Sequence, residues 1–188
     1  MPGSALGRER YESGLTFADF VASAHANVEL WRAVYARAQV NDTVIARMEA
    51  VGGHWHLLVL AEDWCGDAVN TLPVIARLAE RAPNLDLRVL ARDANLDLMD
   101  AHLTNHARSI PVVMVLDDQY QERGWWGPRP GALQTWVVTE GRLLEKEPRY
   151  REVRRWYARD HGESTVDEIV AIIEQANQGE PVNQGPAV

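Results

Sequence analysis

A single cysteine is the residue best placed to do chemistry in this sequence. Cys65 lies between a short apolar run at residues 55–61 and a segment at residues 65–81 whose apolar residues recur at helical spacing. A thiol at such a strand-to-helix junction meets the unpaired backbone N–H groups and the positive dipole end of the helix, which favour a thiolate. The position therefore makes Cys65 the candidate for any thiol chemistry.

The segments around this thiol are predicted to alternate between strands and helices. The expected strands are residues 55–61, 85–91, 111–116 and 120–126, and the expected helices between them are residues 65–81 and 95–103. The turn signal Asp117-Asp118-Gln119 joins the last two strands into an antiparallel hairpin. This order predicts an α/β fold with a mostly parallel sheet and helices on its faces.

Both ends of the chain are predicted to be helical beyond a loosely held N-terminus at residues 1–14. Thr16 is expected to cap one long amphipathic helix that runs to about residue 38, and Thr165 to open the last helix through a capping box. Four acidic residues lie among or beside the arginines between residues 149 and 159, so we interpret this stretch as a solvated, salt-bridged helix face rather than a nucleic-acid site.

Composition limits the classes of function that the chain can serve. With 188 residues and 46% hydrophobic composition, it can bury one sizeable core, so we expect a single domain over residues 1–188. A net charge of −8 disfavours a nucleic-acid or acidic-membrane partner. One cysteine forms no internal disulfide, and no run approaches the ~20 apolar residues of a membrane span. We expect a soluble, cytoplasmic protein.

No metal site is expected from the spacing of potential ligands. Zinc sites use close pairs of cysteine or histidine. His102 and His106 are four residues apart but flank a predicted helix end, and no third ligand is in register with them. His54 and His56 are expected to face solvent at the start of a strand.

Several motifs in order resemble the thioredoxin family. The resemblance rests on Trp64-Cys65-Gly66, on a proline eight residues beyond the cysteine, and on Ser109-Ile110-Pro111 before a hairpin. With Glu-Asp-Trp-Cys-Gly-Asp-Ala and Trp-Gly-Pro-Arg-Pro, the chain also resembles a bacterial branch of thioredoxin-like proteins with a WCGD(A/C) motif. The resemblance implies a central mixed sheet flanked by helices, with a core at about residues 54–127 and helical extensions at about 16–52 and 130–178.

The resemblance also implies roles for individual residues. Cys65 is the expected attacking thiol, and Pro111 the expected cis-proline that faces it. Ile110 would offer backbone hydrogen bonds to an extended substrate, and Trp64 an apolar rim. The complete expected groove consists of Trp64, Gly66, Asp67, Ala68, Arg108, Ser109, Ile110 and Pro111.

Two departures from the family pattern change the expected chemistry. Ala68 stands where the family has its second cysteine, which excludes a dithiol mechanism. Val59 stands where many members have a buried acid, and three other carboxylates are expected to crowd the thiol: Glu62, Asp63 and Asp67. Those carboxylates disfavour a thiolate while the helix terminus favours one, so the direction of the pKa shift stays open.

Two classes of function remain from these residues. The first is a monothiol redox protein, in which Cys65 exchanges with a protein disulfide and an external low-molecular-weight thiol resolves the intermediate, without a cofactor. Reversible capping of Cys65, or its oxidation to a sulfenic acid, is a variant of this reading. The second is a non-catalytic module that binds a peptide or protein beside Pro111, so whether the chain is an enzyme stays open.

Arg108, the two adjacent tryptophans and the terminal helices each allow two interpretations. Arg108 would hold a substrate carboxylate, or form a salt bridge to Asp93 or Asp97. Trp125 and Trp126 would line the groove, or anchor the C-terminal helices. The terminal helices would cover the sheet, or build a homodimer.

Overall fold

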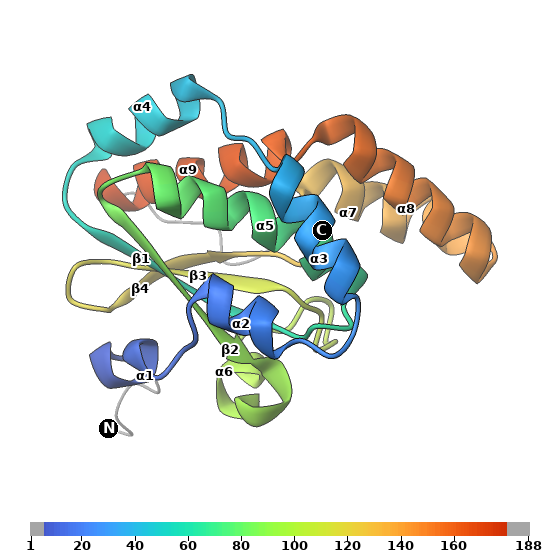
Figure 1. Ribbon diagram of the computed structural model, residues 1–188, viewed down its shortest axis with the longest axis horizontal. Helices are drawn as coiled ribbons and strands as arrows, with labels where there is room; N and C mark the ends of the chain where they lie inside the picture. The colour runs from blue at the N-terminus through green and yellow to red at the C-terminus, as the bar shows by residue number, and fades with distance from the viewer. Residues whose placement is uncertain (1–5, 180–188) are drawn as a thin grey trace.

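A mixed four-stranded sheet forms the centre of the molecule in the computed structural model, which describes residues 6–179 (Figure 1). The strands are β1 (Trp55–Ala61), β2 (Leu85–Ala91), β3 (Val112–Leu116) and β4 (Glu122–Trp126), in the order β2-β1-β3-β4. β1 is parallel to β2, whereas β3 is antiparallel to both β1 and β4. The α/β architecture with a central mixed sheet and flanking helices, which the family resemblance implied, is confirmed. The mostly parallel sheet expected from the alternation of strands and helices is wrong, because two of the three strand pairings are antiparallel.

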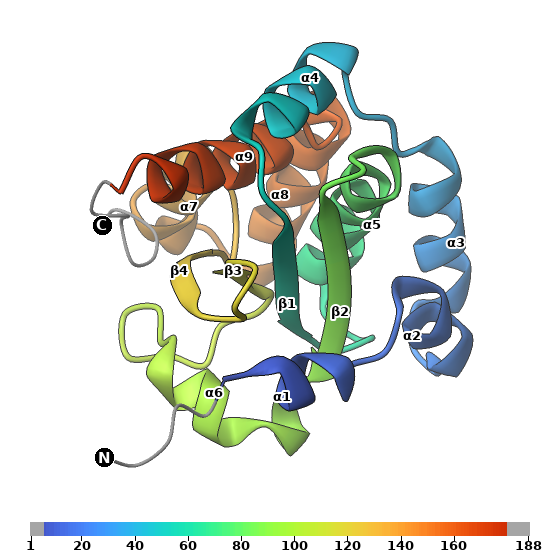
Figure 2. The same cartoon turned by 90° about the vertical axis from the view of Figure 1, so that its left-hand side faces the viewer.

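Helices cover both sides of this sheet (Figures 1 and 2). α5 (Gly66–Arg81) follows β1 and packs beside α9 (Glu163–Asn177) against the strands. α1 and α6 lie on the opposite side of the molecule from these two helices (Figures 1 and 2). The remaining helices are α1 (Arg8–Glu12), α2 (Phe17–Ser23), α3 (Val28–Arg37), α4 (Asp42–Val51), α6 (Leu96–Ala101), α7 (Gly131–Val138) and α8 (Lys146–Asp160), with short 3₁₀ turns at Arg92–Ala94 and Gly141–Leu143.

The core follows from the two central strands. Every residue of β1 and of β3 is buried, as expected for strands covered on both faces. Ile169, Val170 and Ile173 on α9 belong to the same hydrophobic cluster as these strands. The C-terminal segment therefore supplies part of the main core. No helix within residues 6–179 has the length and apolar character needed to cross a membrane.

The long helix predicted from Thr16 to residue 38 is wrong, because two helices occupy this segment. Thr16 caps α2 as expected, since its side chain accepts a hydrogen bond from the Asp19 backbone N–H. The backbone N–H groups of His25 and Ala26 then bond to the Asp63 carboxylate, at 2.6 and 2.9 Å, instead of continuing the helix. A carboxylate distant in the sequence therefore breaks the apolar helical pattern.

Two other terminal expectations also need correction. Residues 8–12 form α1, and Tyr11 on this helix is buried against the sheet, so this part of residues 1–14 is not loosely held. α9 begins at Glu163, ahead of the predicted capping box, and Thr165 is fully buried. Glu168 does not close that box: its carboxylate accepts hydrogen bonds from Trp126 Nε1 and the Gly131 N–H.

Candidate functional site

Cys65 occupies the N-cap position of α5, directly after the loop that leaves β1. Because the N-cap residue precedes the first helical turn, the backbone N–H groups of Asp67 and Ala68 face its sulfur. The Sγ atom lies 3.4 Å from the carbonyl oxygen of Ile110, to which the thiol donates. Only 8% of Cys65 is exposed. The predicted strand-to-helix junction is present, with the thiol turned toward the interior.

The surroundings of Cys65 raise the pKa of its thiol, which answers the question that the sequence left open. Burial is the largest cause, because it penalises the thiolate, and the Asp67 carboxylate adds to it. The backbone N–H groups of Ala68 and Asp67 and the Arg129 guanidinium act in the opposite direction. In the resting structure these opposing groups do not offset burial, so the thiol form is favoured.

A partly buried ionic network behind Cys65 was not predicted from the sequence. The Asp67 carboxylate pairs with Arg129 Nη2 at 2.6 Å and accepts a hydrogen bond from the Tyr157 hydroxyl at 2.9 Å. Arg129 also donates to Gln134 Oε1 at 3.0 Å. Arg129 comes from the loop after β4 and Tyr157 from α8, so the network joins three separate segments.

The sequence analysis missed the roles of Arg129 and Tyr157 for two different reasons. Arg129 lies in the Trp-Gly-Pro-Arg-Pro motif, which we interpreted only as a possible groove wall. Tyr157 lies in the arginine-rich stretch that we assigned to a solvated helix face, but it is buried. No sequence signal singles out Tyr157, because Tyr150 and Trp156 are aromatic residues of the same helix and Tyr150 is exposed.

Two of the three carboxylates expected to crowd the thiol point elsewhere. Asp63 accepts from the His25 and Ala26 N–H groups, which lowers its pKa. Glu62 accepts from the Asp93 N–H at 2.9 Å. Asp67 alone remains as the acidic neighbour of the sulfur.

The Ile110–Pro111 peptide bond is cis, and both residues are buried beside Cys65. Gly127 approaches this loop so closely that an added Cβ would lie 2.1 Å from the Pro111 carbonyl oxygen. Its φ of +130° also lies in a region that favours glycine. Gly127 is therefore a constraint on the loop that faces the thiol.

The outer rim of the site combines Trp64 with two arginines. Trp64 is 52% exposed, and the Arg92 guanidinium carbon lies 5.0 Å from its ring centroid. Arg92 also donates to the Arg108 carbonyl at 3.2 Å, which ties the rim to the loop that leads to Pro111. Ser109 is half-buried in that loop. Gly66 is exposed, and an added Cβ there would meet no atom within 4 Å.

Arg108 forms a salt bridge, but with a different partner from those expected. Its Nε and Nη2 atoms lie 2.6 and 2.9 Å from the two Asp100 carboxylate oxygens. Asp97 instead pairs with Arg10, and Asp93 with Arg92. The bidentate pair turns the donors of exposed Arg108 toward α6.

The remaining sequence-based candidates are placed outside the groove. Trp126 donates to Glu168 and so anchors α9, while Trp125 packs its ring against His102. His102 is buried between the Leu98 carbonyl and the Glu122 carboxylate. The expectation that His56 faces solvent is wrong, because only 5% of this residue is exposed.

Comparisons with known proteins agree with this geometry. A family model described as Thioredoxin matches residues 14–147. No curated protein matches the chain. A Pseudomonas aeruginosa protein of unknown function, PA1234, has a crystal structure that matches with a TM-score of 0.70 and 24% identity, over 88% of this chain and 95% of that one. An HIV epitope-scaffold crystal structure matches with a TM-score of 0.67 and 24% identity, over 88% and 96%. At this identity the two structures support the fold alone.

Proposed function

Since the chain belongs to the thioredoxin family, we propose that it acts as a monothiol redox protein that exchanges disulfides through Cys65. The observation that carries this proposal is the position of the sulfur. It lies at the N-terminus of α5, faced by two backbone N–H groups and adjacent to the cis Ile110–Pro111 bond. A thiolate formed there would be stabilised by those N–H groups and by Arg129.

The proposed cycle needs two external thiols because no second cysteine is present. The Cys65 thiolate attacks one sulfur of a substrate disulfide, forms a mixed disulfide and releases the other substrate sulfur as a thiolate. An external low-molecular-weight thiolate attacks the Cys65 sulfur, releases the second substrate thiolate and leaves Cys65 bound to the small molecule. A second external thiolate attacks the sulfur of that bound small molecule, forms the low-molecular-weight disulfide and releases the Cys65 thiolate. The two substrate thiolates take up the protons that the external thiols lost.

The resting geometry supports slow exchange until a substrate is bound. Burial raises the pKa of Cys65, so little thiolate is present at neutral pH. The thiol also donates to the Ile110 carbonyl, a backbone group that an extended substrate would use. A bound peptide that takes over this carbonyl would release the thiol for attack. We place this activity in a reducing cytoplasm, where external thiols are supplied.

The buried sulfur also favours a second candidate function, a peptide-binding module without turnover. An 8% exposed cysteine with a raised pKa is a poor nucleophile, whereas the 52% exposed Trp64 offers an apolar contact. In this reading, a protein segment packs on Trp64 and along the loop before Pro111. Cys65 then serves only as a small buried side chain.

Turnover separates the two functions. We expect the protein to reduce a peptide disulfide with glutathione as the external thiol, and Cys65→Ser, confirmed as folded by circular dichroism, to lose this activity. Absence of turnover in the wild-type protein, or equal turnover in Cys65→Ser, would refute the redox proposal. In that case, retained capture of the same peptide in reduced form by both proteins would support the binding module.

A further inference from the structure

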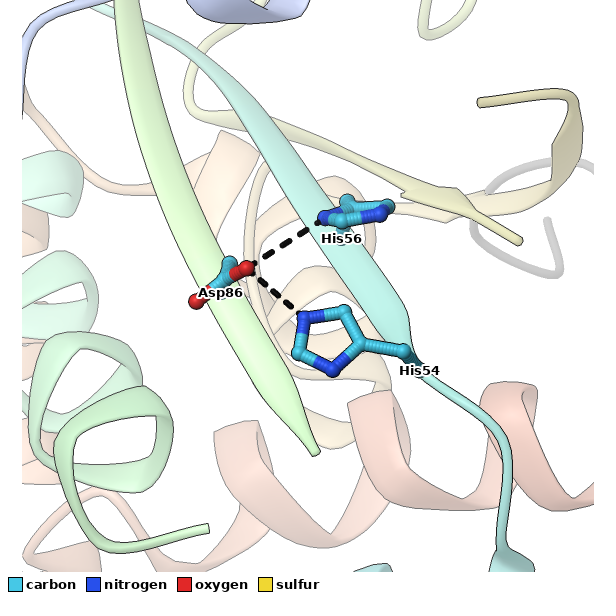
Figure 3. Close-up of side chains that lie close together, drawn as sticks. All are labelled: His54, His56 and Asp86. Carbon is cyan, nitrogen blue, oxygen red and sulfur yellow. Dashed lines mark hydrogen bonds and ion pairs between the residues drawn. The ribbon is translucent and has the colours of Figure 1, made fainter. Parts of the chain in front are cut away.

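Three potential metal ligands, His54, His56 and Asp86, lie close together (Figure 3). They are at the start of β1, whereas Cys65 follows the end of this strand. His54 precedes this strand and His56 is its second residue, so their two-residue spacing places both side chains on one face. Asp86 is the direct neighbour of His56 in the parallel pairing of β1 with β2. Among the histidine, cysteine and acidic side chains of residues 6–179, these three have ligand atoms close enough together to hold a metal ion.

The facing atoms of the three side chains are close to one another. Asp86 Oδ2 lies 2.7 Å from His54 Nε2 and 3.6 Å from His56 Nδ1. All three ligand atoms lie within 4.8 Å of one another. Ligands around a tetrahedral zinc ion, at about 2.0–2.2 Å from the metal, are separated by roughly 3.3–3.6 Å. The observed distances between ligand atoms include values below and above this separation. Small rotations of the His54 and Asp86 side chains, which are partly open to solvent, would bring all three ligand atoms to it.

The buried histidine carries an unused ligand atom. His56 Nδ1 is buried and has no hydrogen-bond partner, since 3.6 Å is too long for a bond to Asp86. The His56 ring stacks on Tyr120 with a centroid distance of 4.3 Å and contacts Tyr11 at 4.9 Å. These two tyrosines hold the imidazole in place, and its free nitrogen points toward Asp86 (Figure 3).

We propose that His54, His56 and Asp86 bind a divalent transition-metal cation of the kind that imidazole prefers, such as Zn²⁺, with water as a fourth ligand. The side chains of His54 and Asp86 are 42% and 57% exposed, so a cation and its water reach the site from solvent. Asp117 and Asp118 in the nearby turn add negative charge around His56. The bound cation would link the start of β1 to the start of β2.

The competing explanation is a simple hydrogen bond between His54 and Asp86. That bond accounts for the 2.7 Å contact but leaves the buried Nδ1 of His56 without a partner. A buried polar atom without a partner is unfavourable, and a metal ion removes this cost. A cation bound between the three side chains would give the His56 Nδ1 atom a partner and use all three groups at once.

Zinc titration of the full chain tests this site. After treatment with a chelator, the protein is expected to bind one equivalent of Zn²⁺ by isothermal titration calorimetry, with a rise in melting temperature. His54→Gln and Asp86→Asn should each weaken binding by at least about tenfold, the lower bound seen when a supporting residue of a metal site is lost. About half of each side chain is exposed and neither belongs to the hydrophobic core, so these variants should stay folded.

Two controls distinguish this site from other sources of binding. His106→Asn removes an exposed histidine from a turn elsewhere and should leave zinc binding unchanged. Cys65→Ser should also leave it unchanged, which excludes the thiol as a ligand. Absence of stoichiometric binding, or binding that His54→Gln, Asp86→Asn and His106→Asn weaken equally, would overturn the proposal.

Discussion

Replacing either partner of the Asp67–Arg129 pair should destabilise the protein while moving the reactivity of Cys65 in opposite directions. In Arg129→Met, the thiol loses the cation that lowers its pKa and keeps the carboxylate that raises it, so its pKa should rise. In Asp67→Asn, the carboxylate is lost and the cation remains, so the pKa should fall. Iodoacetamide should therefore alkylate Cys65 more slowly in Arg129→Met and faster in Asp67→Asn than in the wild-type protein.

The cost in stability follows from the burial of the pair. Breaking a fully buried ion pair by removing one partner costs about 3–5 kcal/mol. The Arg129 and Asp67 side chains are 21% and 14% exposed, and Tyr157 still bonds to Asp67 when Arg129 is lost. We therefore expect the lower end, about 3 kcal/mol for each single variant. The double variant should lose less than the sum, by about 2 kcal/mol, because neither charge is then left unpaired.

Urea unfolding and alkylation rates at several pH values measure both effects. Arg108→Met is the matched control, because this arginine is exposed and pairs with Asp100 away from the sulfur. It should alter neither stability nor alkylation appreciably. If Arg129→Met is alkylated as fast as the wild-type protein, or if the two single losses simply add, the network does not control the thiol as we infer.

Three further predictions concern the same site. Gly127→Ala should lower the unfolding free energy by about 2–4 kcal/mol, because the added Cβ clashes with Pro111 and the φ is unfavourable for alanine. Gly66→Ala should be neutral or slightly stabilising, because its added Cβ meets no atom. Equal urea midpoints for the two variants would contradict this. Ala68→Cys should raise disulfide reductase activity, because a second thiol in the chain can then release the substrate from the mixed disulfide without an external thiol. No gain in turnover would show that a thiol at position 68 does not reach Cys65. Because the folded-state pKa of Cys65 is raised, its contribution to stability is complete below the unfolded pKa of about 8.5 and is lost as the pH rises through the folded value. The stability difference between wild-type protein and Cys65→Ser should therefore decline above that pH in urea titrations, and a constant difference would refute the shift.

Local patterns were sufficient to predict the strands and the junction that carries Cys65. The runs at β1 and β3 consist of consecutive apolar residues, and α5 has its apolar residues at helical spacing, so each element is encoded within its own segment. Those predictions needed no knowledge of which segments meet. The meeting of Cys65 with the loop before Pro111 was implied by the resemblance to the thioredoxin family and not by a local pattern.

Interactions between distant segments could not be predicted in this way. The break between α2 and α3 depends on Asp63, and the Asp67 network depends on an arginine and a tyrosine that belong to other elements. Burial of His56 depends on Tyr11 and Tyr120, which come from α1 and from the turn before β4. In each case the partner is fixed by tertiary packing, which periodicity within one segment does not encode.

The terminal helices take part in building the site because they hold the loop that carries Cys65 from both sides. On one side, Asp63 is fixed by N–H groups of the N-terminal segment, and its carbonyl accepts from Trp31 Nε1 at 3.0 Å. On the other side, Asp67 is fixed by Tyr157 of α8. The Asp63 carboxylate is thereby held by the N-terminal segment, whereas the Asp67 carboxylate stays beside the sulfur and raises the pKa of the thiol. The helical extensions therefore set the position and the charge environment of the thiol, in a domain that has a single cysteine with which to work.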